Sequence, residues 1–303
     1  MSISASMVKE LRERTGAGMM ECKKALVEAS GNMDEAVELL RKSGQAKADK
    51  KSGRIAAEGR VAIATDGHKA AMIEINSETD FVAKDENFTL FAQAVVARVL
   101  AGDAVDVVHL AAEKLPDGRT IEQARTELVT KVGENISLRR LARVEATGQL
   151  GSYTHGARIG ALVSLQGGDG DLARDIAMHV AATNPICIDD TGVPAETLER
   201  ERRIFSEQAA ESGKPPEIIE KMVVGRIAKF LKEITLVGQP FVKDPDVTVA
   251  KLLKDSGASV ASFVRFEVGE GIEKKEENFA EEVARQIEQS KKAANDPESQ
   301  EPV

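Results

Sequence analysis

Histidine and cysteine side chains, which can act as acids, bases, nucleophiles or metal ligands near neutral pH, are scarce in this sequence. None of the four histidines belongs to an HExxH pattern, whose spacing would place two imidazoles on one helix face for zinc. The two cysteines, Cys22 and Cys187, form no CxxC pair and indicate neither a zinc site nor a disulfide framework. No Gly-x-Ser-x-Gly or Cys–His arrangement stands out. We therefore expect no catalytic residue and no metal site.

Phosphate-binding patterns are absent as well. The sequence has no GxxxxGK[ST] loop, and the glycine-containing stretch 156–160 lacks the following helix and lysine that would cradle a phosphate. Those glycines suit a β-hairpin and close backbone packing instead. The 50 acidic residues are too many for any one pair to indicate acid–base catalysis. We expect a protein that is not an enzyme, uses no cofactor and binds neither GDP nor GTP.

The composition is that of an acidic protein with aliphatic cores. Hydrophobic residues make up 42% of the 303 residues, but aromatic residues only 3%. The formal net charge of -9 disfavours binding to a nucleic-acid backbone, which attracts clustered lysine and arginine. No apolar run approaches the roughly 20 residues of a membrane-spanning helix, and the N-terminus lacks a signal-peptide core. We expect a soluble, cytoplasmic protein with reduced thiols that binds neither nucleic acid nor membrane.

The first part of the chain has the pattern of three short helices over residues 4–43. Ser4 can cap the first helix, and Gly44 is expected to end the third. Three helices in a segment of this length resemble a ubiquitin-associated fold. The segment 47–60 has little periodicity and is expected to be a linker or an exposed helix.

From Val61 onwards the apolar period changes from helical to alternating, which indicates β-strands. Asp66-Gly67 between two such strands is a strong hairpin signal. The order strand, turn, strand, helix then recurs and indicates a divergent repeat. The expected elements are strands at 61–64, 70–75, 136–144, 150–153 and 160–165, and helices at 87–101, 121–132 and 171–182.

The remaining part is expected to be helical apart from one strand. Two helices around Ser212-Gly213-Lys214-Pro215-Pro216 should form an antiparallel hairpin over about 191–231. In a strand at 260–268, one face would carry Val260, Ser262, Val264 and Phe266. An acidic helix at 278–290 and a disordered tail from 293 are expected at the end.

These elements predict an α+β fold with a three-helix N-terminal domain, a duplicated antiparallel-sheet-plus-helix core, a projecting helical hairpin and a C-terminal helix. The sequence leaves open whether the core forms a homodimer within a larger complex. The expected boundaries are 1–55 for the N-terminal domain and linker, 56–145 and 146–272 for the two core subdomains, about 190–233 for the hairpin inserted in the second, and 273–303 for the C-terminal helix and tail.

Phe81 is the side chain whose role the pattern leaves most open. After its second strand the first copy of the repeat has residues 78–86, where the second copy has only a short glycine-rich turn. One interpretation is a hydrophobic staple, in which Phe81 packs on its own following helix through Phe88 or Phe91. The other is a protruding apolar wedge with Asp80 beside it as a charged probe, since exposed aromatic side chains commonly anchor interfaces. The pattern alone favours the staple.

Met19 and Met20 pose a similar choice between core and surface. Two adjacent helical residues cannot both point fully inward, so we expect at least one of them to be exposed. Methionine suits an adaptable contact surface, although a domain of this size often uses both in a small core.

Together these segments are similar to the elongation factor Ts family along almost the whole chain. Five blocks in one order are not expected by chance. The blocks are VKELRERTGAGMM (8–20), TDFVAK (79–84), GSYTHGARIG (151–160), GQPFV (238–242) and RFEVGEGIE (265–273).

The resemblance implies a partner, the GTPase elongation factor Tu, and a role as a guanine-nucleotide exchange factor in the elongation phase of protein synthesis. It implies that the segment of Thr79, Asp80, Phe81, Val82 and Ala83 enters the GTPase domain near its Mg²⁺ and phosphate-binding loop. The C-terminal helix and the N-terminal helices, the latter with Arg12, Met19, Met20 and Lys23, are implied to grip the same domain. The segment with His155 and Gly156 is implied to touch a more distant domain, and the helical hairpin to be a coiled coil.

Two other functions stay open at this point. A helical adaptor of the ubiquitin-associated type would explain residues 4–43, but it leaves the duplicated core without a purpose. An enzyme that uses His155 would lose turnover in a His155→Ala variant, whereas an exchange factor would lose only partner affinity.

Overall fold

A computed structural model of the chain describes residues 3–211 and 213–273. Within it, the chain up to Glu270 forms one compact unit. The acidic helix expected at 278–290 and the tail expected from 293 lie outside the described residues. The domain boundaries drawn from the sequence stay a prediction.

Three helices form the N-terminal part, as predicted: α1 (Ala5–Thr15), α2 (Met19–Glu28) and α3 (Met33–Lys51). Ser4 caps α1 by accepting a hydrogen bond from the Met7 N–H. Their apolar faces meet in a small core that includes Leu11, Cys22 and Leu26. The predicted start of the chain is therefore confirmed at the level of its elements.

The prediction that Gly44 ends the third helix is wrong. Gly44 is buried inside α3, where this helix lies against α7 (Ile121–Val132). A Cβ atom at Gly44 would lie 3.1 Å from Thr130 Oγ1, so the missing side chain allows the two helices to approach closely. The segment 47–60 is accordingly shared between the end of α3, a turn and the next strand.

The first three-stranded sheet is antiparallel, with the order β1-β2-β3. Its strands are β1 (Glu58–Asp66), β2 (Lys69–Ser77) and β3 (Ile136–Glu145), and Asp66 pairs with Lys69 across the predicted hairpin turn. Helices α5 (Glu86–Ala101) and α7 pack on this sheet around an aliphatic core with Phe88, and α6 (Val107–Ala112) lies between them in sequence.

The second three-stranded sheet repeats this plan with β4 (Gln149–His155), β5 (Ile159–Gln166) and β8 (Ser259–Glu267), in the order β4-β5-β8. Helix α8 (Gly170–Thr183) packs on it, as α5 packs on the first sheet. Both central strands carry a register shift after their sixth residue, at Glu74/Ile75 and at Ser164/Leu165. A shared strand order and a shared bulge position support the predicted repeat.

The bulge in the second sheet corrects one prediction about β8. Ser164 pairs with Ser262 but Leu165 pairs with Val260, so one strand position between them is unpaired and the side-chain alternation changes face there. Val260 packs toward α8, whereas Val264 and Phe266 pack toward the first sheet. The expectation that all four residues share one face is therefore wrong for Val260, which lies on the face opposite to Ser262, Val264 and Phe266.

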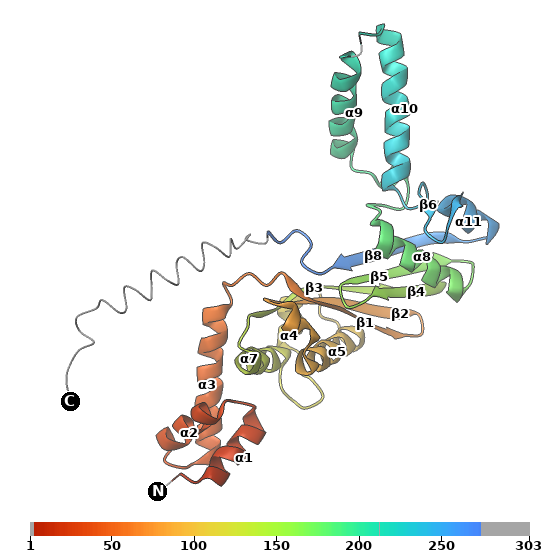
Figure 1. The fold of residues 1–303 in the computed structure, drawn as a ribbon. Coiled ribbons are helices and arrows are strands. Elements are labelled where there is room, and N and C mark those ends of the chain that lie inside the picture. Colours follow the sequence, from red (N-terminus) through yellow and green to blue (C-terminus); the bar gives the residue numbers. More distant parts are fainter. Residues whose placement is uncertain (1–2, 212, 274–303) are drawn as a thin grey trace, which may run out of the picture. The chain divides into compact units, whose positions relative to one another are not determined.

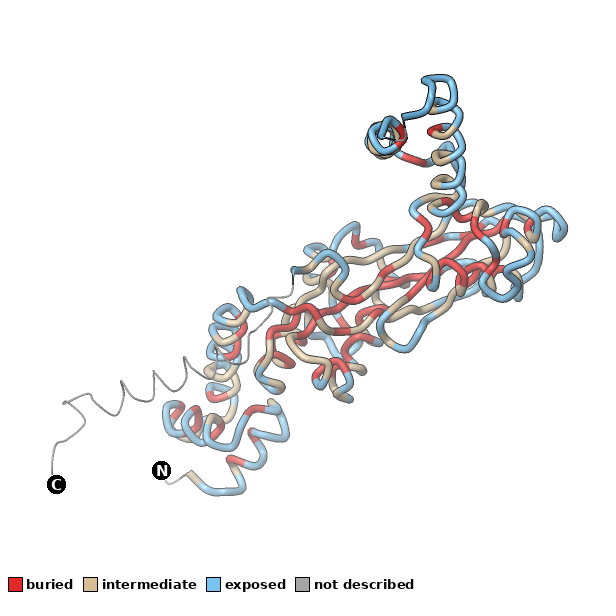
Figure 2. The backbone as a smooth tube through the Cα atoms, turned by 45° about the horizontal axis from the view of Figure 1, so that its top comes forward, coloured by how far each residue is buried: buried red, intermediate tan, exposed pale blue. Residues whose placement is uncertain are grey.

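The two sheets pack face to face through a layer of apolar side chains, among them Val61, Met72, Leu162 and Phe266. Helices cover the other face of each sheet, so the core has four layers in the order helix, sheet, sheet, helix. Figure 2 shows that the buried stretches of the chain follow the strands of this double sheet.

The predicted helical hairpin consists of α9 (Ala195–Ala210) and α10 (Pro216–Ile234), which extend away from the second sheet (Figure 1). Phe205 and Phe230 meet edge to face between the helices, with ring centroids 6.4 Å apart. Four short elements next to the hairpin were not predicted from the sequence: a 3₁₀ turn (Asp190–Gly192), β6 (Pro240–Phe241), β7 (Asp244–Thr248) and α11 (Val249–Asp255).

Candidate partner-binding site on helix α4

The residues after β2 form a short helix, α4 (Asp80–Lys84), which was not predicted from the sequence. Thr79 caps its N-terminus, because the Thr79 Oγ1 atom accepts a hydrogen bond of 3.4 Å from the Val82 N–H. Asp85 ends α4 and caps α5, accepting hydrogen bonds from the N–H groups of Asn87 at 2.8 Å and Phe88 at 3.2 Å. Two consecutive caps thus define where α4 begins and where the next helix starts.

Phe81 projects from α4 with 81% of its surface exposed. The next two residues, Val82 and Ala83, are buried at 8% and 7% exposure and attach α4 to the core. Phe88 is fully buried without any contribution from Phe81. The staple interpretation is therefore wrong, and α4 presents one large apolar ring to its surroundings.

Asp80 adds a negative charge beside this ring. Its carboxylate accepts a hydrogen bond of 2.6 Å from Lys84 Nζ one helical turn later. This bond, the Lys84 charge, the N–H group at the start of α4 and the more distant Arg158 hold the pKa of Asp80 below its usual value. Asp80 is therefore ionised at neutral pH.

The β4–β5 turn, which carries His155 and Gly156, lies against the start of β1. The Val61 N–H donates to the Ala157 carbonyl oxygen at 2.8 Å. Helix α4 packs on β1 as well, so two segments far apart in sequence are supported by one strand. Gly156 adopts a left-handed φ of 58° in the turn, and the exposed His155 ring stacks with Tyr153 at a centroid distance of 6.4 Å.

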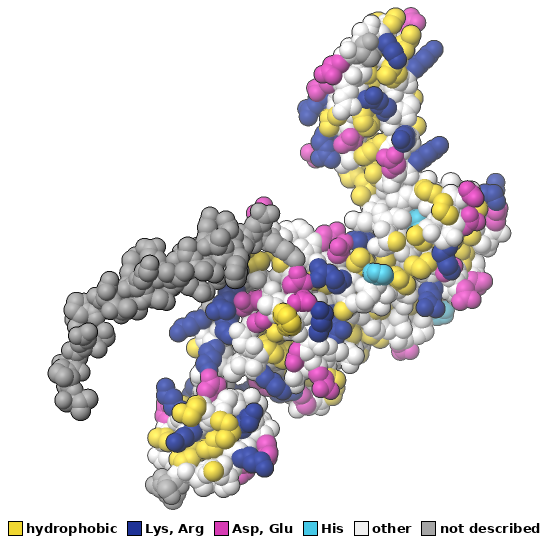
Figure 3. Space-filling model, viewed as in Figure 1, with side chains coloured by type: hydrophobic (Ala, Val, Ile, Leu, Met, Phe, Trp, Pro, Cys, Tyr) yellow, Lys and Arg dark blue, Asp and Glu magenta, His cyan; other side chains and the backbone are white. Residues whose placement is uncertain are grey.

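The N-terminal residues implied in binding are all exposed: Arg12 on α1, and Met19, Met20 and Lys23 on α2. Met20 is 76% exposed and Met19 47%, so the pair contributes more to the surface than to the core. Figure 3 shows apolar and basic side chains next to one another on these helices. In the part of the chain that the structure describes, no hydrogen bond or ion pair connects this group to Thr79–Ala83 or to His155.

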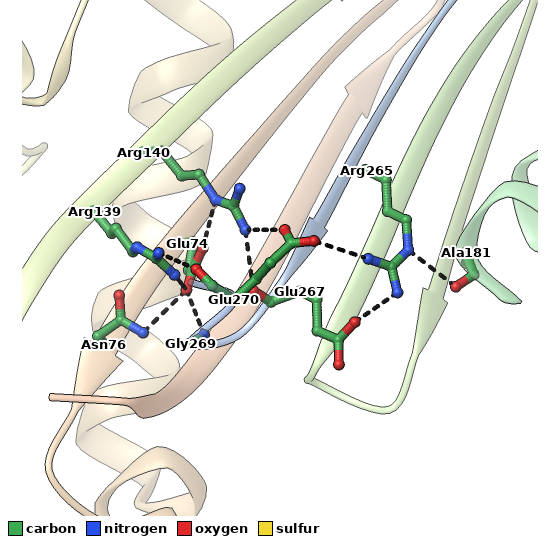
Figure 4. Close-up of polar contacts among 9 residues, drawn as sticks. All are labelled: Glu74, Asn76, Arg139, Arg140, Ala181, Arg265, Glu267, Gly269 and Glu270. Carbon is green, nitrogen blue, oxygen red and sulfur yellow. Dashed lines mark hydrogen bonds and ion pairs between the residues drawn. The ribbon is translucent and has the colours of Figure 1, made fainter. Parts of the chain in front are cut away.

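Glu74 is a fully buried carboxylate with several hydrogen-bond partners inside the fold. Its two oxygens accept hydrogen bonds from Arg139 at 2.8 Å, Arg140 at 2.6 Å, Asn76 at 3.1 Å and the Gly269 N–H at 2.8 Å (Figure 4). Burial raises the pKa of Glu74, but these hydrogen bonds outweigh it and leave the pKa below its usual value. Such a group does not take up a proton near neutral pH, and it serves to attach the end of β8 to the first sheet.

His179 is also internal. Its side chain is fully buried on α8, where Nδ1 accepts from the Val242 N–H at 3.1 Å and Nε2 lies 3.0 Å from Gln239 Oε1. Burial lowers the pKa of His179, so the ring is neutral and donates from Nε2. This histidine supports the core beside the helical hairpin.

Glu134 is a residue near the site that the sequence analysis did not single out. It follows α7, and its carboxylate binds both the N–H and the hydroxyl of Thr79, which is 55 positions away in the sequence. The only local signal is a polar turn, Gly133-Glu134-Asn135, between a helix and a strand. That pattern predicts a loop but does not indicate which residues its side chains contact.

Comparisons with known proteins cover nearly all of the chain. A family model described as Elongation factor TS matches residues 78–270. The chain is 64% identical over 290 residues to Elongation factor Ts of Thioalkalivibrio sulfidiphilus, an alignment that covers 94% of this chain and 99% of that protein. It is 61% identical over 290 residues to Elongation factor Ts of Methylococcus capsulatus, with 95% and 99% covered. No helix within the described residues is both long and apolar enough to cross a membrane.

Proposed function

The chain belongs to the elongation factor Ts family and is a translation elongation factor, and we propose that it releases GDP from the GTPase elongation factor Tu. The resemblance stated from five sequence blocks is thereby confirmed at the level of the family. The exchange activity, the partner and the contact residues are our proposal, and we place the protein in the cytoplasm with the translation machinery.

The observation that carries this proposal is the exposure of Phe81 on a helix that is itself held in place. In the free chain, an aromatic side chain that is 81% exposed keeps most of its contact with water. A partner that buries it gains the hydrophobic and packing energy typical of an interface hot spot. The ring sits on α4, whose neighbouring side chains Val82 and Ala83 are already buried, so little ordering is needed on binding.

We propose that the partner surface is the region that holds the phosphates of GDP. Backbone amides and a Mg²⁺ ion bind such phosphates, and both depend on the position of a few loops and helix ends. Insertion of Phe81 between these elements would displace them. The ionised Asp80 beside the ring would add a negative charge where the nucleotide needs positive charge. In this scheme Val82 and Ala83 anchor α4, while Phe81 and Asp80 reach into the partner.

The remaining surfaces would supply binding energy that is not in itself specific for exchange. We assign to this role the exposed Arg12, Met19, Met20 and Lys23 of the N-terminal helices. The β4–β5 turn with His155 and Gly156 would contact another part of the partner. Thr79 has a different task, because its side chain is already engaged within the chain.

The energetic demand on such a mechanism is modest. Two ligands of one protein affect each other reciprocally, so a factor that weakens GDP binding is itself weakened by GDP to the same extent. A 100-fold effect corresponds to about 2.7 kcal/mol, which one buried aromatic side chain and an interface of ordinary size can supply. GTP that then enters the empty site would expel the factor. No bond to phosphorus is made or broken.

Release of a fluorescent GDP analogue from elongation factor Tu tests the proposal. We expect the chain to accelerate release in a saturable manner, and added GTP to dissociate the complex. Formation of a stable complex without faster release would contradict exchange and would favour the adaptor alternative.

A further inference from the structure

Glu134 lies where the end of α7 meets the base of α4. Helix α7 ends at Val132, and Gly133 follows with a left-handed φ of 80°, which turns the chain sharply. The turn places the half-buried Glu134 beside Thr79, the residue that caps α4. The junction therefore joins a long helix of the core to the short helix that carries Phe81.

Two hydrogen bonds connect Glu134 to Thr79. Glu134 Oε2 accepts from the Thr79 N–H at 3.0 Å, and Glu134 Oε1 accepts from the Thr79 hydroxyl at 2.7 Å. A hydroxyl group has one hydrogen and two lone pairs. Because the Thr79 hydrogen points to Glu134, a lone pair of the same oxygen remains free to accept from the Val82 N–H and cap α4. Glu134 thus sets the orientation of the cap.

A second set of contacts holds the two loops together. Asn135, which is 4% exposed, donates its backbone N–H to Glu78 Oε1 at 2.6 Å. Its side-chain amide donates to the Arg54 carbonyl oxygen at 2.8 Å and to that of Ser52 at 3.3 Å, just beyond α3. With these contacts in place, loss of Glu134 need not separate the loops, but it would release Thr79.

Helix α4 cannot hold its own orientation. Five residues are far fewer than an isolated helix needs for stability in water. Phe81 adds little packing energy within the chain, because it is 81% exposed. The orientation of α4 therefore depends on two things, the burial of Val82 and Ala83 and the cap that Glu134 supports.

We propose that Glu134 is a positioning residue for nucleotide exchange, which acts through Thr79 to hold Phe81 in its productive orientation. The proposal rests on the exchange function proposed above. Without Glu134, α4 would sample other orientations, and only a fraction of complexes would carry Phe81 in place. Since the exposed N-terminal helices would still bind the partner, the loss would fall on the maximal release rate and not on the concentration for half-saturation.

The test compares GDP release from elongation factor Tu by the full-length chain, Glu134→Ala, Phe81→Ala and the double variant. We expect Glu134→Ala to lower the maximal release rate about tenfold, as loss of a charged hydrogen bond would. In the Phe81→Ala background the same substitution should have no further effect, because Glu134 acts through that ring. The melting temperature of each variant is measured alongside.

Matched variants distinguish a loss of positioning from the mere loss of a negative charge and from a failure to fold. Glu134→Gln keeps an acceptor for the Thr79 N–H and a donor toward its oxygen, so it should retain most of the rate. Glu145→Ala removes the same charge from the opposite end of the first sheet, where Glu145 forms only an exposed ion pair with Lys69, and should not change the rate. Should Glu134→Ala fail to fold, Thr79→Val removes the same hydroxyl contact and should show the same loss, which Thr79→Ser should reverse.

Three results would overturn the proposal. One is an unchanged maximal rate for Glu134→Ala when the wild-type chain accelerates release. Another is a double variant in which Glu134→Ala lowers the maximal release rate of Phe81→Ala by the same factor as it lowers that of the wild-type chain, since Glu134 would then act independently of Phe81. A wild-type chain that does not accelerate release at all would remove the proposed function itself, and this proposal with it.

Discussion

Two carboxylates of this chain show how surroundings decide what an acidic side chain can do. The Asp80 carboxylate on α4 is half-exposed, and Lys84 and solvent share its charge. Glu74 is fully buried, with both oxygens bound by two arginines, an asparagine amide and a backbone N–H. An exposed carboxylate is available to a partner. A buried one with all its partners inside the chain contributes to stability.

Glu74→Ala should therefore destabilise the fold strongly. Removal of one partner from a buried ion pair leaves the other charges uncompensated, and typically costs about 3–5 kcal/mol. Here Arg139 and Arg140 would lose their shared acceptor, and the Gly269 N–H would lose its contact with β2. Urea unfolding measures the change in the free energy of unfolding. Glu145→Ala, at an exposed ion pair, serves as control, and equal effects of the two substitutions would contradict this account.

Glu74 should also make the free energy of unfolding depend on pH. Because the folded-state pKa of Glu74 is below its usual value, the stability it contributes is fully present above the unfolded pKa of about 4.3. That contribution is lost as the pH falls through the folded-state value, where the carboxylate takes up a proton. The difference in unfolding free energy between the wild-type chain and Glu74→Gln should be constant at neutral pH and narrow below about pH 4.3. A difference independent of pH would refute the assignment.

At the scale of elements, local signals in the sequence predicted a good part of the fold. The helix expected at 121–132 is α7, which Thr120 and Gln123 cap reciprocally and Gly133 ends. Asp66-Gly67 marked the first hairpin correctly. Caps and turns act over a few residues, so their rules can be applied to the sequence directly.

What the sequence could not show depends on contacts between distant segments. Gly44 has the pattern of a helix end, but the proximity of Thr130 gives this glycine a packing role inside α3. The bulge in β8 follows from its pairing with β5 and has no local signature. Phe81 could be named as a candidate, but its exposure and its support by Glu134 required the fold.

Because α8 lies very close to β4 at Gly151, we expect a side chain at this position to destabilise the fold. A Cβ atom at this position would lie 2.0 Å from the Ala173 carbonyl oxygen of α8, so Gly151→Ala must push the helix off the sheet. We expect a loss of about 3 kcal/mol or more in unfolding free energy, the upper range for overpacking. Gly67→Ala is the control. It has open space but a φ of 56°, and should cost only about 1–2 kcal/mol.

Both glycine substitutions restrict the unfolded chain equally. The difference between their unfolding free energies therefore reports on the folded state. In thermal unfolding, the melting temperature of Gly151→Ala should be clearly lower than that of Gly67→Ala. Equal melting temperatures would show that α8 does not approach β4 as closely as described here.

At the scale of the whole molecule, one architecture occurs twice, and its first copy carries the exposed phenylalanine Phe81. Both halves have three antiparallel strands with a packed helix, and they share an apolar layer between the sheets. Only the first half has α4 inserted between its central strand and the following helix. Under the proposed mechanism the duplicated core acts as a rigid support, against which binding energy from several surfaces can seat Phe81 in the partner.

The maximal rate of GDP release from elongation factor Tu, measured at saturating concentrations of wild-type chain and of Phe81→Ala, tests this mechanism most directly. We expect Phe81→Ala to fold and to bind the partner, but with a maximal rate lower by about 30-fold, the equivalent of a hot spot of about 2 kcal/mol. A variant that reaches the wild-type maximal rate, and differs only in the concentration it needs, would contradict the claim that Phe81 drives nucleotide release.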